Sequence, residues 1–204
     1  MRILSWNIAA KSLVLALVAL TAIPLGMTSA KAQDNGDAAA TTTVQPMRIA
    51  NGTRFGAWRV NCEAIAVNET ACVLSQRLVR TSDNVFLAEL LAFWSGDGSK
   101  SYLAARVPNG VYFPSGFALK REDSDDRQNF VWQSCSRDIC EALLELPIED
   151  IEALEGSENI IAGYRPSLRS QPLVFRTSMQ GASEGLNALK ASMLSGGEEG
   201  EADN

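Results

Sequence analysis

The sequence predicts a mainly β protein: a single β-sandwich or barrel-like domain of seven to nine strands, with two disulfide-closed hairpins and a C-terminal helix. Short stretches alternate apolar and polar residues, which is the pattern of a strand with one buried face. Clusters of Gly, Pro, Asn and Asp separate these stretches and mark turns. Four cysteines follow a predicted export signal, and an even number of cysteines in an exported chain indicates disulfides.

Residues 1–32 have the layout of a cleavable signal peptide. Arg2 and Lys11 precede residues 12–27, which are uncharged and mostly apolar. This stretch is shorter than the ~20 apolar residues that span a bilayer, so a retained membrane anchor is the less favoured alternative. Small residues at Ala30 and Ala32 predict cleavage after Ala32, with Ala30 as the alternative.

Export and charge together limit the expected partners. We expect a protein of the periplasm, or one that is secreted or associated with the outer membrane, with no transmembrane segment after signal cleavage. The full chain has a formal net charge of -6, and removal of residues 1–32 takes away three basic residues and no acidic one, which leaves -9. A domain this acidic is not expected to bind nucleic acid or an anionic membrane surface.

The two ends of the mature chain differ in composition from its middle. Residues 33–52 are rich in Ala, Thr and Gln without a periodic apolar pattern, which predicts a flexible linker. Residues 195–204 are rich in Gly and acidic residues, which predicts a disordered, solvated tail. The residues between them, 53–194, are sufficient for one β domain with one core.

Alternation and turn residues locate the strands within this domain. Helical spacing appears only twice, in residues 147–154, which begin with a proline, and in residues 182–194, where apolar residues recur on one side. We expect strands at 55–62, 72–78, 85–94, 101–107, 111–113, 116–120, 128–134, 140–146 and 172–179.

The cysteines of the mature chain are Cys62, Cys72, Cys135 and Cys140, which allow three pairings. We favour Cys62 with Cys72 and Cys135 with Cys140, because each pair brackets a predicted hairpin. In a bulge-free first hairpin, Val60 lies opposite Leu74, so that two apolar faces match. Zinc binding and redox activity are less favoured, since the spacings match neither a zinc ribbon nor Cys-x-x-Cys.

The second hairpin is less regular. Simple register through its cysteines sets Val131 against Leu144 and Trp132 against Leu143, which leaves apolar residues on both faces. Either both faces are covered or a bulge intervenes.

The chain lacks the residues that most catalytic sites use. It has no histidine, which removes the commonest general base, the serine and cysteine triads and most zinc catalysis. It also has no Ser-x-x-Lys, phosphate-loop or dinucleotide motif. We therefore expect a protein that is not an enzyme and that needs no cofactor and no metal.

Two groups of acidic residues are candidates for function. The first is an acidic loop at Glu122, Asp123, Asp125 and Asp126. Its spacing does not fit a calcium loop, and we interpret it as solvated, with the binding of a basic partner as its alternative role. The second group, Glu141 and Glu145, lies on one face of a predicted strand. A solvated outer face is the favoured interpretation, and an acid and base acting on a sugar bond is the alternative.

Five segments in order resemble the invasion-associated locus B family of small exported proteins, which occur mainly in alphaproteobacteria. The resemblance covers about residues 53–190, and its segments are 55–62 (FGAWRVNC), 72–76 (CVLSQ), 107–111 (VPNGV), Phe130 with Cys135 and Cys140, and 178–181 (SMQG). The chain departs from the family at Ala182, where we expect phenylalanine, and in its longer and more acidic loop at 122–127.

The resemblance implies a periplasmic or surface-associated protein, linked in some relatives to host-cell entry, with no catalytic residues to carry over. Our first hypothesis is a non-enzymatic periplasmic or secreted interaction protein of the bacterial envelope, which binds a protein or another envelope component and supports host-cell association. The alternatives are a small periplasmic binding module or enzyme inhibitor that uses the acidic loop, and a hydrolase that uses Glu141 and Glu145.

Overall fold

The computed structural model describes residues 49–67 and 69–197. The predicted signal peptide, the linker up to residue 48 and the tail from residue 198 lie outside the described residues. The mainly β fold with a C-terminal helix is confirmed. The elements are β1 (Arg54–Phe55), β2 (Trp58–Ala66), β3 (Glu69–Val79), β4 (Phe86–Trp94), β5 (Ser101–Pro108), the 3-10 helix η1 (Phe113–Ser115), β6 (Phe117–Arg121), β7 (Arg127–Ser136), β8 (Ile139–Glu145), α1 (Ile148–Glu155), β9 (Ile160–Tyr164), β10 (Leu173–Thr177) and α2 (Ala182–Gly197).

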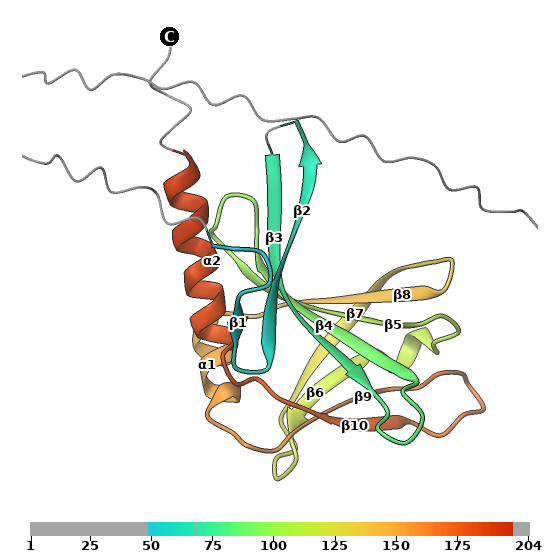
Figure 1. Ribbon diagram of the computed structural model, residues 1–204. Coiled ribbons are helices and arrows are strands. Elements are labelled where there is room, and N and C mark those ends of the chain that lie inside the picture. Colours follow the sequence, from blue (N-terminus) through green and yellow to red (C-terminus); the bar gives the residue numbers. More distant parts are fainter. Residues whose placement is uncertain (1–48, 68, 198–204) are drawn as a thin grey trace, which may run out of the picture. The chain divides into compact units, whose positions relative to one another are not determined.

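The ten strands form one continuous antiparallel sheet in the order β1-β2-β3-β4-β5-β8-β7-β6-β9-β10. Strand β7 joins two parts of this sheet, because it pairs with β8 on one side and with β6 on the other. We call β1 to β5 with β8 the first half, and β6, β7, β9 and β10 the second half (Figure 1). One continuous sheet matches the barrel-like alternative more closely than a sandwich of two separate sheets.

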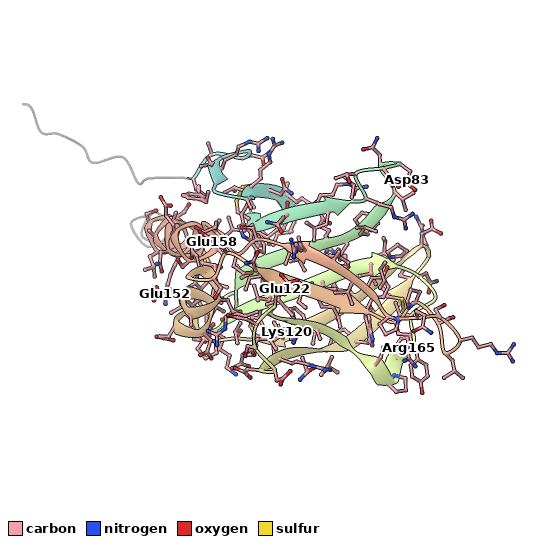
Figure 2. The ribbon with its side chains drawn as sticks, turned by 90° about the horizontal axis from the view of Figure 1, so that it is seen from below. Asp83, Lys120, Glu122, Glu152, Glu158 and Arg165 are labelled. Atoms are coloured by element: carbon pink, nitrogen blue, oxygen red, sulfur yellow. A yellow bond between two sulfur atoms is a disulfide. The ribbon has the colours of Figure 1, made fainter. Side chains whose placement is uncertain are left out.

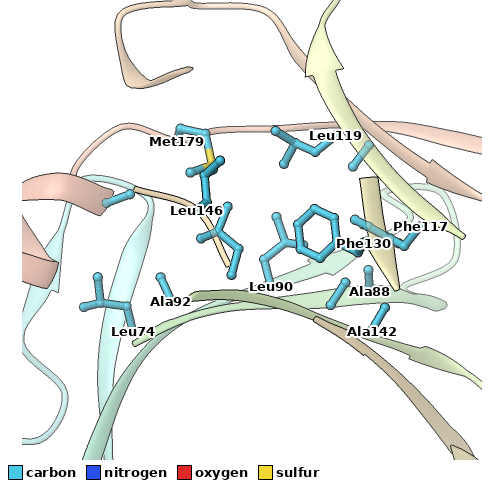
Figure 3. Close-up of a cluster of buried hydrophobic side chains, with 14 of the residues drawn as sticks. Leu74, Ala88, Leu90, Ala92, Phe117, Leu119, Phe130, Ala142, Leu146 and Met179 are labelled. Carbon is cyan, nitrogen blue, oxygen red and sulfur yellow. The ribbon is translucent and has the colours of Figure 1, made fainter. Parts of the chain in front are cut away.

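The core lies between the inner faces of the two halves. Figure 3 shows Leu90 of β4, in the first half, close to Phe130 of the second half, and both side chains are buried. The Tyr164 hydroxyl of β9 also donates a hydrogen bond to the Leu87 carbonyl of β4, at 3.4 Å. The two halves thus share one core. Because side chains alternate along a strand, one set points to this core and the other to the outer face.

Two predictions of local structure were wrong. Residues 111–113 do not form a strand; a 3-10 helix begins at Phe113 instead, and its next residue, Pro114, lacks the N–H that a strand ladder uses. Strand β9 was not predicted. Its five residues include Gly163, which weakens the alternating pattern that marks a strand.

The two helices lie at one end of the sheet, where α2 runs beside β1, β2 and β3 (Figure 1). Helix α1 follows Pro147 as predicted and buries Ile151 and Leu154. The indole of Trp94 donates a hydrogen bond to the Leu186 carbonyl of α2 at 2.7 Å, which ties the helix to β4. In the ranges 49–67 and 69–197, neither helix has the length and apolar character to cross a membrane.

Candidate functional site

Both predicted disulfides are present. Cys62 is bonded to Cys72 and Cys135 to Cys140, and the Cα atoms of each pair are 4.0 Å apart. The register of the first hairpin also matches the prediction: Val60 lies opposite Leu74, and both side chains are fully buried. The first bridge therefore holds β2 and β3 in the register that turns their apolar faces to the core.

The second hairpin contains a bulge. Val131 lies opposite Leu143 and Trp132 opposite Ala142, but Ser134 then lies opposite Glu141, so Gln133 is an extra residue. Trp132 is buried and Val131 is 67% exposed. Of the two explanations left open by the sequence, the bulge is the right one.

The hairpin of β2 and β3 continues well beyond the core. Residues 63–67 and 69–71, which we call the hairpin extension, are all exposed. Figure 1 shows the two strands projecting past the rest of the sheet. Two aliphatic side chains lie near the tip, where Ile65 is 59% exposed and Val67 is 92% exposed. The Cys62–Cys72 bridge lies at the base of the extension and braces it.

The acidic loop joins β6 to β7, and the domain itself engages two of its four carboxylates. Arg176 of β10 donates two hydrogen bonds to the Glu122 carboxylate, at 2.9 and 2.8 Å. An oxygen of Asp125 lies 3.8 Å from the Lys120 Nζ atom. Glu122 and Asp125 therefore partly neutralise cations of the neighbouring strands and are less available to an external basic partner.

The other two carboxylates of the loop, Asp123 and Asp126, are exposed. Within residues 49–67 and 69–197, no cation lies within ion-pair distance of either. Any contact of the loop with a basic partner would therefore depend mainly on these two residues.

Glu141 and Glu145 do not share a cleft. Arg106 Nε donates to Glu141 at 2.8 Å, and Lys100 Nζ donates to Glu145 at 2.9 Å. Glu145 lines a hollow of about 290 Å³, whereas Glu141 is not part of it. A glycosidase pair must flank the same bond, and the structure does not bring these two carboxylates together in that way.

The described part of the chain also shows no candidate metal site. No group of three or more Cys, Asp or Glu side chains is placed there to hold a metal ion.

A groove lies on the outer face of the second half of the sheet. It has a volume of about 330 Å³, and its walls come from β6, β7, β9, β10 and the chain on either side of them. Ala118, Gly163 and Val174 stand side by side across three strands and form its floor and one wall. We call this hollow the outer groove.

The outer groove is basic, although the chain is acidic. Three of its lining residues are Lys120, Arg127 and Arg165, and none is Asp or Glu. Figure 2 shows Lys120 and Arg165 on this half of the sheet, with Glu122 near Lys120. An apolar floor and positive charge therefore coincide in the outer groove.

Sequence reasoning missed both the outer groove and the hairpin extension. Ala118, Gly163 and Val174 come from three separate strands, one of which was not predicted, and no motif links them. The extension lies within the predicted first hairpin, but alternation does not show where a hairpin leaves the core. The sequence alone therefore did not predict that Ile65 and Val67 are exposed.

Comparisons with known proteins agree with the fold. The family model described as Invasion associated locus B (IalB) protein matches residues 58–190. Invasion protein B homologs from two strains of Brucella abortus, 2308 and 9-941, are each 27% identical over 136 residues, which is 66% of this chain and 76% of the relative. The crystal structure of invasion associated protein B from Bartonella henselae superposes with a TM-score of 0.56 at 18% identity, covering 68% of this chain and 94% of that one.

The family match runs from β2 into α2 and so includes both disulfides, the acidic loop and the outer groove. It also contains most of the segments on which the resemblance rested. The chain belongs to the Invasion associated locus B family.

Proposed function

We propose that this protein is a non-enzymatic interaction protein of the bacterial envelope, exported by its signal peptide, and that it contacts its partner through the hairpin extension. The observation that carries the proposal is the exposure of the whole extension, with Ile65 and Val67 near its tip. Membership of a family described as invasion associated supports a role in host-cell association.

The energetics favour a binding role for the extension. Burying an exposed valine or isoleucine side chain contributes about 1.5 to 3 kcal/mol, so the tip can add substantially to the affinity for a partner. The Cys62–Cys72 bridge holds the two strands together before any partner binds. Less conformational entropy is then lost on binding, which is the advantage of a preorganised surface.

Site-specific cross-linking in cells tests the proposal. A light-activated cross-linking amino acid replaces Ala66 in the extension or, as the control, Ala153 on the exposed face of α1. We expect an adduct with a distinct partner from position 66 and not from position 153. The adduct should disappear when Ile65→Ser and Val67→Ser are added.

Leu168→Ser is the matched control, because Leu168 is 64% exposed in a loop away from the hairpin. This change should leave the adduct intact. The absence of any adduct at position 66, or an adduct that persists in the Ile65→Ser/Val67→Ser variant, would contradict the proposal.

The binding module that uses the acidic loop remains a second candidate, and the exposure of Asp123 and Asp126 favours it. Asp123→Asn/Asp126→Asn should then weaken partner binding without affecting the fold, because neither residue makes an ion pair within the described residues. Binding that is unchanged in this variant would remove the candidate.

A further inference from the structure

We propose that the outer groove binds a small organic anion that carries an apolar body, with Arg127, beside Lys120 at one end of the groove, holding its charge and Ala118 and Gly163 forming the floor beneath the apolar part. The proposal does not depend on the hairpin extension, because the groove belongs to the second half of the sheet and the extension to the first. The two can therefore be tested separately.

The depth of the groove is set by small residues in its floor. Ala118 and Gly163 lie opposite each other on β6 and β9, and Gly163 lies opposite Val174 on β10. A Cβ atom at Gly163 would lie 2.7 Å from the Leu173 carbonyl oxygen, too close for a side chain without a backbone shift. The glycine keeps the floor low, and Val174, which is 58% exposed, stands beside it as an apolar wall.

The cations lie toward the two ends of this floor. Lys120 pairs in register with Ile161 of β9, and Arg165 follows Ile161 by four residues, a span of roughly 13 Å along a strand. Arg127 lies opposite Lys120 on β7. A ligand in the groove would thus meet positive charge near either end and apolar surface between.

Nearby carboxylates leave most of this charge available. Lys120 donates to the Ser124 carbonyl at 2.5 Å and has Asp125 at 3.8 Å, but the Asp125 side chain is fully exposed and can turn away. Within the described residues, Arg127 and Arg165 make no ion pair. Guanidinium groups bind carboxylate and phosphate through paired hydrogen bonds, so both are suited to an anionic head group.

The volume and lining point to a small ligand in place of a protein segment. A volume of about 330 Å³ lies at the lower end of the range for small-molecule sites, which combine a mostly apolar lining with a few placed polar groups. The net charge of -6 disfavours approach to an extended anionic surface, whereas a small anion meets only the local field of the groove.

Calorimetric titration of the disulfide-intact protein tests the proposal with three probes. Octanoate and octyl phosphate carry the two candidate anionic groups on the same chain, and octanol is the neutral control; octyl phosphate is kept below its micelle concentration. We expect at least one anion to bind and octanol to bind about tenfold more weakly or not at all. Binding of only one anion identifies the head group as carboxylate or phosphate.

Variants locate the site. Arg127→Gln should weaken binding of the anion about tenfold, whereas Arg165→Gln, at the opposite end of the floor, should weaken it less, and Arg59→Gln, at an exposed arginine of the first half, should not weaken it. Ala118→Leu fills the groove and should abolish binding, whereas Ala71→Leu, on the exposed hairpin, should have no effect.

Three results would overturn the proposal: no heat of binding with either anion, equal binding of octanol, or anion binding that survives both Ala118→Leu and Arg127→Gln. None of these bears on the cross-linking of the hairpin extension.

Discussion

The backbones of Gly56 and Gly181 pack directly against each other. A Cβ atom at Gly56 would lie 2.7 Å from the Gln180 carbonyl carbon, and one at Gly181 would lie 2.7 Å from the Gly56 nitrogen. Both residues have positive φ angles, of 53° and 86°, which side chains disfavour. The Ala57 N–H also donates to the Gln180 carbonyl at 3.0 Å. This contact joins two of the segments that carried the family resemblance, from opposite ends of the domain.

Alanine at either glycine should therefore destabilise the domain. We expect Gly56→Ala and Gly181→Ala each to lower the free energy of unfolding by about 2 to 3 kcal/mol, because each adds backbone strain and a steric clash. Gly96→Ala is the control, since nothing lies within 4 Å of a Cβ atom there and its φ is not positive. Urea unfolding measures all three, and equal midpoints for Gly181→Ala and Gly96→Ala would show that the contact is not needed.

Glu155 of α1 caps the first turn of α2. Its carboxylate accepts hydrogen bonds from the Gly181 N–H at 2.6 Å, from the Ser183 N–H at 3.1 Å and from the Ser183 hydroxyl. An anion at a helix N-terminus satisfies free N–H groups and interacts favourably with the helix dipole. Glu155→Ala should lower the free energy of unfolding by about 1 to 2 kcal/mol. Thermal unfolding of both variants measures this effect. Glu152→Ala, at an exposed position of the same helix, should change the free energy of unfolding little.

The two disulfides should contribute unequally. The bridge Cys62–Cys72 spans a sequence separation of 10 and Cys135–Cys140 one of 5, and a longer closed loop restricts the unfolded chain more. We expect Cys62→Ala/Cys72→Ala to cost about 2 to 3 kcal/mol of unfolding free energy and Cys135→Ala/Cys140→Ala somewhat less. Guanidinium unfolding of both variants makes the comparison, and the reverse order would count against this explanation.

Asp97, in the turn between β4 and β5, should titrate at unusually low pH. Hydrogen bonds from the Ser95 hydroxyl, and then from the Ser99 N–H and hydroxyl, lower the pKa of Asp97 from 3.8 to about 2. Because the folded pKa is the lower one, the stabilisation is present above pH 3.8 and is lost as the pH falls toward 2. Carboxylate NMR titration should give a midpoint of about 2, which Ser95→Ala should raise. A midpoint near 3.8 in the unchanged protein would contradict this.

Much of the first half of the fold could be predicted from the sequence because local signals agree there. Cys62 and Cys72 flank a turn, and alternation around them places Val60 and Leu74 on one face, so pairing and register follow together. In the second hairpin, apolar residues on both faces left open a bulge or two covered faces, and the structure shows a bulge at Gln133.

The second half depends on contacts between distant residues and was less predictable. Strand β9 pairs with β10, the next strand along the chain, only across a long loop, and its pairing with β6 brings Gly163 beside Ala118 over a sequence separation of 45 (163 − 118). The acidic loop was identified correctly as a cluster in sequence. Its ion pair between Glu122 and Arg176 depends on β10 lying beside β9, which no local pattern shows.

The outer groove could not be predicted from the sequence for the same reason, because pairing between distant strands brings its basic residues together. Lys120, Arg127 and Arg165 form no cluster in the sequence, and it is the antiparallel pairing of β6 with β7 and β9 that gathers them. Ala182, the departure from the family pattern, is fully buried at the start of α2, so the small residue is accommodated within the core.

Peptide mapping without reduction, on protein taken from the periplasmic fraction, tests the central claim that this chain is exported and braced by bridges between near neighbours in sequence. We predict an N-terminus at Gln33, or at Lys31, with peptides linked through Cys62–Cys72 and Cys135–Cys140. Uncleaved protein confined to the cytosol, with four thiols open to alkylation, would contradict the account.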